Sequence, residues 1–357
     1  GRVRYLEDRD GDGQYETSTL FATGLSYPSD IMAWRRGVLV TAAPHIWYLE
    51  DTNQDGRADR REPWFQGFGE GNQQHRVNGL RWGLDNWVYV ANGDSGGTVQ
   101  STKTDDSVTI NGRDLRIRPD SGQLAAATGQ TQHGRNRDDW GNWWGANNSF
   151  PMYQYLLKDS YLRRNPHVPP PSPRVNIVTL NNAPIHPISR VLSHYSNYRK
   201  PAPGEPGRFT SACSTIVYRD QHLGPEFYGN MFVSAPVHNL VHRRVIEWDG
   251  IQMTSRKPAG EENREFLRSR DSWFRPTTLR TGPDGGLWVA DMYRLVIEHP
   301  EWIDDTVEKT LELRAGHDKG RIYRVVPVDR PTRKIPNLAT LNTRQLVQRL
   351  ADPNGWV

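Results

Sequence analysis

Short apolar runs recur along the chain, and each follows a polar turn built around glycine or asparagine. Three of them share a fuller pattern, which reads GLDNWVYVANGD from Gly83, DWGNWWGANN from Asp139 and GPDGGLWVAD from Gly282. Turn residues before the run and a small polar residue after it are typical of a strand. We interpret the runs as the second strand, B, of successive blades: Val38–Val40, Trp87–Val90, Trp143–Trp144, Met231–Val233 and Leu287–Val289.

A third strand, C, is expected after each B strand, at Ile46–Leu49, Asp114–Ile117, Tyr153–Leu157, Leu240–Ile246 and Ile322–Val326. One more strand of this type, Val3–Leu6, opens the sequence. Repetition of one strand unit is the signature of a repeat fold. The pattern predicts an all-β fold, a six-bladed β-propeller whose first blade is incomplete at the N-terminus. A β-sandwich is the alternative, but it would not repeat one turn-and-strand signature three times.

Two segments interrupt the repeat, and the character of the chain changes near its end. Residues 158–207 are rich in Pro, Asn and Arg and predict a long surface insertion, and residues 298–316 look partly helical. We therefore expect the propeller to occupy residues 1–327. Apolar positions at helical spacing within 337–350 predict that residues 328–357 hold a linker and the first helix of a helical-repeat domain.

Composition narrows the function classes. The net charge of +4 is spread without a basic cluster, so we expect no nucleic-acid partner. No stretch approaches the roughly 20 apolar residues of a membrane span. The single cysteine, Cys213, excludes an internal disulfide and is expected to be a small buried residue.

Two loops, 43 residues apart by the numbering, have the spacing of calcium ligands. Alternate oxygen-bearing side chains turn toward one centre, and a glycine at the sixth position permits the sharp turn. The second loop keeps all the ligand positions of an EF-hand, whereas the first has Thr19 in place of the last glutamate, so we expect the first to bind more weakly. The predicted ligands, with a structural role, are Asp8, Asp10, Asp12 and Glu16, and Asp51, Asn53, Asp55, Asp59 and Glu62. Ordinary polar turns are the alternative.

Strand order predicts which loops share a face. In an up-and-down blade the connections before strand A and after strand B lie together, and the two acidic loops lie at the opposite ends of the strands. The first face would collect these polar loop residues: His75, Asn92–Asp94, His133, Asn147, Asn148, His238, Arg275, Asp291 and Tyr293. Imidazole, guanidinium and carboxylate groups brought together in this way indicate a candidate site, with His75 as general base, although polar loop residues also cap strands.

Four long motifs in order carry a family resemblance. They are QHRVNGLRWGLDNWVYVANGD, SACSTIVYRDQHLGPEFYGNMFVSAPVHNLVHR, EFLRSRDSWFRPTTLRTGPDGGLWVADMYRLVIEHPEW and DKGRIYRVVP. Over residues 1–327 the chain resembles the propeller domain of the planctomycete-type membrane-bound dehydrogenases, related to soluble quinoprotein glucose and aldose sugar dehydrogenases. The resemblance implies a sugar or alcohol substrate, pyrroloquinoline quinone (PQQ) with calcium, and a haem-c electron acceptor. It also implies a periplasmic or extracellular location, with membrane association through regions outside this chain.

The resemblance assigns roles residue by residue. His75 matches the catalytic base, Arg275 matches an arginine that holds the quinone, and Asn148 and Ser149 fall where a catalytic calcium is held. Asp291 joins the catalytic set, and His238 or Asn239 occupies the region where the relatives carry a lysine. The stretch Gly129–Gln132 lacks an arginine found in the relatives, and each lost charge-assisted contact weakens binding by about 1.5–3 kcal/mol.

Three functions follow from these residues. The first is a secreted quinoprotein-like oxidoreductase of sugars or alcohols on a calcium-binding propeller. The second is a cofactor-free, lyase-type enzyme that acts on glycans with the same histidine and arginine. The third is a non-catalytic propeller that binds a glycan or a protein.

Overall fold

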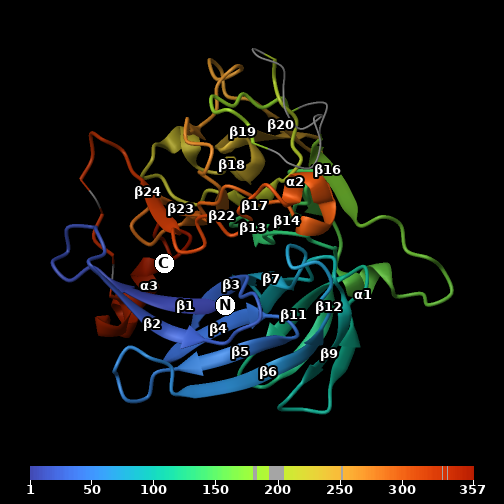
Figure 1. Cartoon of the computed structure of the whole chain (residues 1–357). Helices are drawn as coiled ribbons and strands as arrows, with labels where there is room; N and C mark the ends of the chain where they lie inside the picture. The colour runs from blue at the N-terminus through green and yellow to red at the C-terminus, as the bar shows by residue number, and fades with distance from the viewer. Residues whose placement is uncertain (180–182, 193–204, 251, 332, 336) are drawn as a thin grey trace. The chain divides into compact units, whose positions relative to one another are not determined.

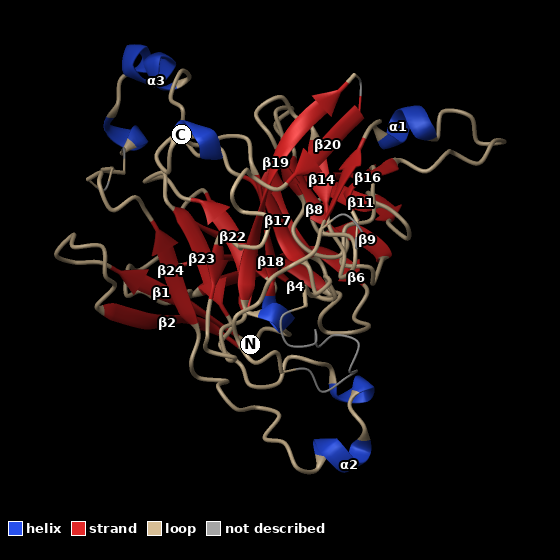
Figure 2. Ribbon diagram, turned by 90° about the horizontal axis from the view of Figure 1, so that it is seen from above, coloured by secondary structure: helices blue, strands red, loops and turns tan. Residues whose placement is uncertain are grey.

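The computed structural model describes residues 1–179, 183–192, 205–250, 252–331, 333–335 and 337–357. The fold is an all-β propeller fold in which strands greatly outnumber the short helices (Figure 2). The chain divides into two compact units. Unit 1 holds residues 1–135 and 157–173, and unit 2 holds residues 136–156 and 174–357.

Unit 1 contains two blades and a separate hairpin, coloured blue to teal in Figure 1. The hairpin is β1 (Arg2–Glu7) with β2 (Thr17–Thr23). The first blade is β3 (Asp30–Trp34), β4 (Gly37–Ala42), β5 (His45–Glu50) and β6 (Arg60–Phe68), and β9 (Gly97–Ser101) and β10 (Ser107–Thr109) extend it beyond β6. The second blade is β7 (Asn78–Trp82), β8 (Val88–Ala91), β11 (Asp114–Arg118) and β12 (Gln123–Ala127), and the helix α1 spans Asp159–Leu162.

Unit 2 contains three blades. The first is β13 (Asn136–Arg137), β14 (Trp143–Gly145), β15 (Met152–Tyr155) and β16 (Arg174–Val178). The second is β17 (Cys213–Val217), β18 (Met231–Ala235), β19 (Leu240–Asp249) and β20 (Gln252–Arg256), with β21 (Leu267–Arg268) beside β19. The third is β22 (Pro276–Thr281), β23 (Leu287–Asp291) and β24 (Arg321–Val325).

The helices among the described residues of unit 2 are one or two turns long. They are η2 (Pro225–Phe227), η3 (Pro236–His238), η4 (Pro300–Trp302), α2 (Asp305–Glu308), η5 (Leu338–Thr340) and α3 (Thr343–Arg349). Among the described helices, none is long and apolar enough to cross a membrane.

The core forms between strands, as alternating and fully apolar strands predict. Every residue of β17 and β18 is buried, whereas β23 alternates buried and half-buried positions. Within unit 1 one cluster joins Leu39, Phe65 and Ile117, and within unit 2 another joins Trp144, Met152 and Val233. Cys213 is buried as expected, and burial raises the pKa of its thiol to about 12.

The prediction of six blades is wrong: the described chain forms five. The strand Val3–Leu6 exists within β1, but it pairs only with β2, so these two strands make a hairpin and not a blade. The B and C strands of the five blades were otherwise predicted at the right places, from Val38–Val40 in β4 to Ile322–Val326 in β24.

Two segment boundaries differ from expectation. The predicted insertion 158–207 contains β16, which pairs with β15 as the fourth strand of its blade. Residues 180–182 and 193–204 of that range lie outside the described residues. The predicted C-terminal helix is present as α3 within unit 2, and the residues after it bond to the turn before β23: the Asn354 amide donates to the Gly282 carbonyl at 2.8 Å, and Asn354 is buried.

Candidate functional site

His75 lies just before β7, next to the turn that follows β8. Its backbone N–H donates to the Asn72 carbonyl at 2.9 Å, and its own carbonyl accepts from the Ser95 hydroxyl. The imidazole is half-buried. His75 is therefore fixed by the backbone on one side and by the turn after β8 on the other.

The Gln132 side chain connects His75 to a carboxylate. Its Nε2 lies 3.0 Å from His75 Nε2 and 2.9 Å from Asp94 Oδ2, and the Gln130 amide donates to the other oxygen of Asp94 at 2.9 Å. A carboxylate only accepts hydrogen bonds, so it requires the amide nitrogen of Gln132 on its side. The same nitrogen then donates to His75 Nε2, which places the proton of a neutral His75 on Nδ1.

A buried carboxylate holds the turn that carries Asp94. Asp114 is fully buried and accepts from the backbone N–H groups of Asn92 at 3.0 Å and Thr131 at 2.9 Å, and it pairs with Arg135 at 2.5 Å. Gly93 has φ of 73°, and a Cβ there would lie 2.1 Å from the Arg76 carbonyl oxygen, so only glycine fits. Asp114 on β11 therefore holds both the turn after β8 that carries Asp94 and the segment after β12 that carries Gln132.

His133 lies beside His75, with ring centroids 6.2 Å apart. Burial, followed by the charge that His75 would carry, lowers the pKa of His133 to about 4. His133 is therefore neutral near pH 7 and adds no positive charge to the site.

Arg275 belongs to unit 2, whereas His75 belongs to unit 1. The predicted convergence of these two residues therefore stays a prediction. The surroundings of Arg275 within unit 2 are clear: it is 0% exposed, and its guanidinium donates to the backbone carbonyls of Arg294 at 3.0 Å, Pro236 at 3.0 Å and Leu295 at 2.8 Å. Burial lowers its pKa to about 10, so it remains charged near pH 7. Arg275 links two loops.

Asp291 and His238 are buried beside the same loops. Asp291 Oδ1 accepts from the backbone N–H of Arg275 at 2.7 Å and of Tyr293 at 2.8 Å, and burial raises the pKa of the carboxyl. His238 is fully buried at the end of η3. Asp291 therefore caps the turn after β23 in unit 2. This is the strand-capping role that we gave as the alternative for polar loop residues.

Asn148 and Ser149 lie after β14 and are half-buried. The Asn148 carbonyl accepts from the backbone N–H of Ala212 at 3.0 Å, and the Ser149 N–H donates to the Asn147 side chain at 3.1 Å. The backbone here is thus ordered by its own contacts.

The residues predicted to hold PQQ do not fit it. Its carboxylates require exposed cations or amides, yet Arg275 and His238 are each 0% exposed, and the Arg275 donors already reach backbone carbonyls. The Gly129–Gln132 segment supplies amides, but Gln130 and Gln132 are bound to Asp94.

The first acidic loop gathers its carboxylates. Oxygens of Asp8, Asp10, Asp12 and Glu16 all lie within 4.8 Å of one another. Asp8 accepts from the backbone N–H groups of Gly11 at 2.7 Å and Gly13 at 2.9 Å, which bends the loop around it. Four carboxylates at this spacing fit Ca²⁺, which prefers oxygen ligands.

The second loop repeats this backbone arrangement with one carboxylate fewer. Asp51 accepts from Gln54 N at 2.7 Å and Gly56 N at 2.7 Å, and Asp59 accepts from Thr52 N at 2.8 Å. Glu62, expected to complete the site, lies instead on β6. It accepts from Arg60 Nε at 2.9 Å and from Trp64 Nε1 at 3.0 Å, so it is held on the strand by its own ion pair and does not join the loop oxygens.

Gln130 and Gln132 are the site residues to which the sequence assigned no role, whereas Asp94 was expected on the same face as His75. Only the departure of the Gly129–Gln132 stretch from the family pattern marked the two glutamines. The available signal was the spacing of the two glutamines after β12. Residues at positions i and i+2 of an extended segment face the same side, so Gln130 and Gln132 could be expected to act together.

Several solved structures are similar to the chain. A luciferin-regenerating enzyme is 10% identical, covering 89% of this chain and 84% of its own at a TM-score of 0.47. The soluble aldose sugar dehydrogenase of Escherichia coli is 13% identical, with 81% and 87% covered and a TM-score of 0.44. The PQQ-bound aldose sugar dehydrogenase of Streptomyces coelicolor is 13% identical, with 82% of each chain covered and a TM-score of 0.42. At these scores the likeness supports no inference about chemistry.

No curated protein matches the sequence. One family model does, and it covers residues 1–329, which includes all five blades and the His75 site. The chain therefore belongs to the family described as a domain of unknown function, DUF7133.

Proposed function

We propose that this propeller is an oxidoreductase of sugars or alcohols in which His75 accepts the proton of a substrate hydroxyl. The observation that carries the proposal is the link from His75 through Gln132 to Asp94. In the neutral imidazole, Nε2 of His75 accepts from the Gln132 amide, so its lone pair is directed at a donor. A substrate hydroxyl that replaced the Gln132 amide would meet the same lone pair, and a neutral imidazole is a suitable base near pH 7.

The charge of the site favours a neutral hydroxylated substrate. Asp94 is exposed and accepts from both Gln130 and Gln132, so a carboxylate is held one side chain away from His75. A uronate substrate of a lyase would be repelled by it. The lyase-type alternative needs a cation to stabilise the developing enolate, and Arg275, the residue expected to serve, is buried with its donors bound to carbonyls.

The reaction balances as an alcohol oxidation. The O–H proton goes to His75 Nε2, the carbinol carbon loses a hydride to a two-electron acceptor of the quinone or dye class, and a carbonyl group forms. A haem-c domain or protein would take the electrons onward. Because the residues expected to hold PQQ do not fit it, no step is assigned to PQQ.

A dye-coupled assay tests the proposal. Purified chain is mixed with aldoses and simple alcohols, a phenazine mediator and a reducible dye, with and without added PQQ and calcium. We expect turnover that His75→Gln abolishes and that His167→Gln, a change at an exposed loop residue, leaves intact. Absence of turnover under every condition, or full activity of His75→Gln, would contradict the assignment.

Calcium and location belong to the same proposal. The four carboxylates of the first loop are proposed to bind Ca²⁺ and to fix the β1–β2 hairpin. Exposed loops of this kind bind calcium at about 10⁻⁴–10⁻³ M in extracellular modules. A periplasmic or extracellular compartment is where such a loop would be filled.

A further inference from the structure

A pocket of about 640 Å³ opens in unit 1 at the strand ends opposite His75. Three turns form it: β3 to β4, β7 to β8, and β11 to β12. The strand β7 separates it from the catalytic candidate, because His75 precedes Asn78 at one end and Trp82 is its last residue. Five residues of strand span roughly 15 Å, so the pocket is a site of its own.

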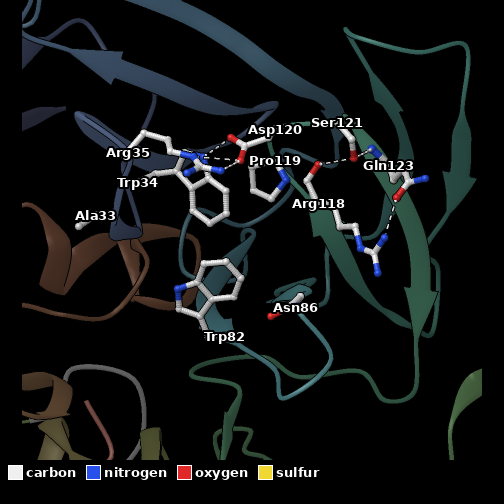
Figure 3. Close-up of a pocket in the computed structure, with 10 residues that line it drawn as sticks. All are labelled: Ala33, Trp34, Arg35, Trp82, Asn86, Arg118, Pro119, Asp120, Ser121 and Gln123. Carbon is white, nitrogen blue, oxygen red and sulfur yellow. Dashed lines mark hydrogen bonds and ion pairs between the residues drawn. The ribbon is translucent and has the colours of Figure 1, made fainter. Parts of the chain in front are cut away.

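Two tryptophans form the apolar wall. The indoles of Trp34 and Trp82 stack with ring centroids 5.0 Å apart and an interplanar angle of 26°. Trp34 is 6% exposed and supports the wall, whereas Trp82 is 44% exposed and presents its ring to the pocket (Figure 3). A flat aromatic surface is thus held in place by a second one behind it.

Polar side chains surround this wall in fixed positions. Asp120 accepts from Trp34 Nε1 at 2.8 Å and from Arg35 Nε at 3.0 Å. The Arg118 guanidinium donates to the Gln123 amide oxygen at 3.2 Å on the other side of the pocket. In Figure 3 the Arg35–Asp120 pair lies at one end of the pocket and Asn86 near the other.

The arrangement combines an aromatic face with planar donors and acceptors. A pyranose ring has a face of C–H groups that packs on an indole and a periphery of hydroxyls that both donate and accept. Asp120, Gln123 and Asn86 offer acceptors, and Arg118 and the amides offer donors. The volume lies within the roughly 300–1,000 Å³ of small-molecule sites. The charged groups of the lining are bound within it, because Asp120 pairs with Arg35 and Arg118 donates to Gln123, so the exposed aromatic face is the main contact surface.

We propose that this pocket binds a neutral saccharide, with one pyranose ring stacked on Trp82 and its hydroxyls bonded to Asp120 and the polar residues opposite. The site is independent of the His75 chemistry, since it uses other turns of the same two blades. It would hold a glycan chain at the opposite strand ends, whether or not His75 is catalytic.

Calorimetric titration with defined oligosaccharides tests the proposal. The probes are cellohexaose, xylohexaose, laminarihexaose, mannohexaose and N-acetylchitohexaose, with hexagalacturonate as an anionic comparison. We expect a neutral probe to bind and to quench tryptophan fluorescence. Trp82→Ala should weaken binding at least tenfold, as loss of an aromatic stacking partner does.

Matched variants make the outcome decisive. Trp140→Ala removes a tryptophan that is 74% exposed and lies in unit 2, so it should bind normally, as should His75→Gln. Asp120→Asn, which keeps the shape of the wall, serves as the second pocket variant if Trp82→Ala does not fold. Binding by none of the neutral probes, binding of hexagalacturonate alone, or a normal affinity in the folded pocket variants would overturn the proposal.

Discussion

Replacing Arg275 with methionine separates a structural role from a catalytic one. The guanidinium is fully buried and joins the loop at Pro236–Val237 to the loop at Arg294–Leu295. Methionine fills a similar volume but donates nothing, so carbonyls of both loops would lose their partners without access to water. We therefore expect a loss of stability that exceeds any surface arginine substitution.

The magnitude follows from the bonds that are lost. A buried carbonyl without a partner costs about 1–3 kcal/mol. Arg275→Met removes the donor from at least one carbonyl in each loop, Pro236 and Leu295, so two such costs together give about 4 kcal/mol. With a urea slope of about 2 kcal/mol per molar, a loss of about 4 kcal/mol lowers the unfolding midpoint by about 2 M.

Urea unfolding followed by tryptophan fluorescence measures this change. Arg275→Lys keeps the charge but loses the planar fork, so its midpoint should lie between those of the wild type and Arg275→Met. Arg256→Met is the control, because its ion pair with Glu247 is exposed and contributes about 0–1 kcal/mol. If Arg275→Met unfolds at the same urea midpoint as that control, Arg275 does not hold the two loops together. Lost activity in such a stable variant would restore a direct role.

Three further expectations can be checked on the same protein. A chelator should lower the melting temperature, because calcium at 100 times its Kd stabilises the folded state by about 2.7 kcal/mol. Asp12→Asn should remove more of this chelator response than Asp55→Asn does. The reverse order would refute the assignment of calcium to the first loop. The pKa of His133 is lowered to about 4, so the unfolded chain binds more protons than the folded chain between pH 6.5 and 4, and the free energy of unfolding falls on acidification. The free energy of unfolding should fall by about 2 kcal/mol from pH 6.5 to 5. If the urea midpoint of His133→Asn depends on pH as strongly as that of the wild type, this assignment is wrong. Cys213, whose thiol pKa is about 12, should resist iodoacetamide at pH 8 until the chain is unfolded, and rapid native labelling would refute its burial.

Strands were predictable where local signals agreed. The turn pairs before β8, β14 and β23 fix where each strand begins, and the apolar run fixes its extent. The hairpin of β9 and β10 gave no such signal, because its partner is β6 of the preceding blade. Whether two distant segments pair depends on which sheet edge is free to accept a strand. The hydrophobic periodicity of a sequence carries no information about that edge.

The place of His75 before β7 was predictable from the sequence, but its hydrogen-bond partners were not. His75 could be placed by its distance from β7, but its partner Gln132 lies 57 residues away, and its orientation depends on Asp94. For Arg275, the sequence suggested a contact with a ligand, whereas the structure shows contacts with backbone carbonyls. Arginine is rarely fully buried, so a loop arginine suggested a ligand contact, and only the three-dimensional positions of the facing carbonyls make its burial favourable.

Glu62 shows why a metal-binding pattern cannot be carried from one structural context to another. In an EF-hand the twelfth residue lies on a helix, which turns it back toward the loop. Here the loop leads into β6, where residues at i and i+2 face the same side. Arg60, Glu62 and Trp64 therefore form a row on one face of the strand, and the carboxylate bonds to its neighbours in that row. The residue that does close each loop is the ninth, Glu16 or Asp59, whose carboxylate accepts from the backbone N–H of the second residue. Since the two loops share this closure, the number of carboxylates decides between them, and that favours the loop that the sequence pattern ranked second.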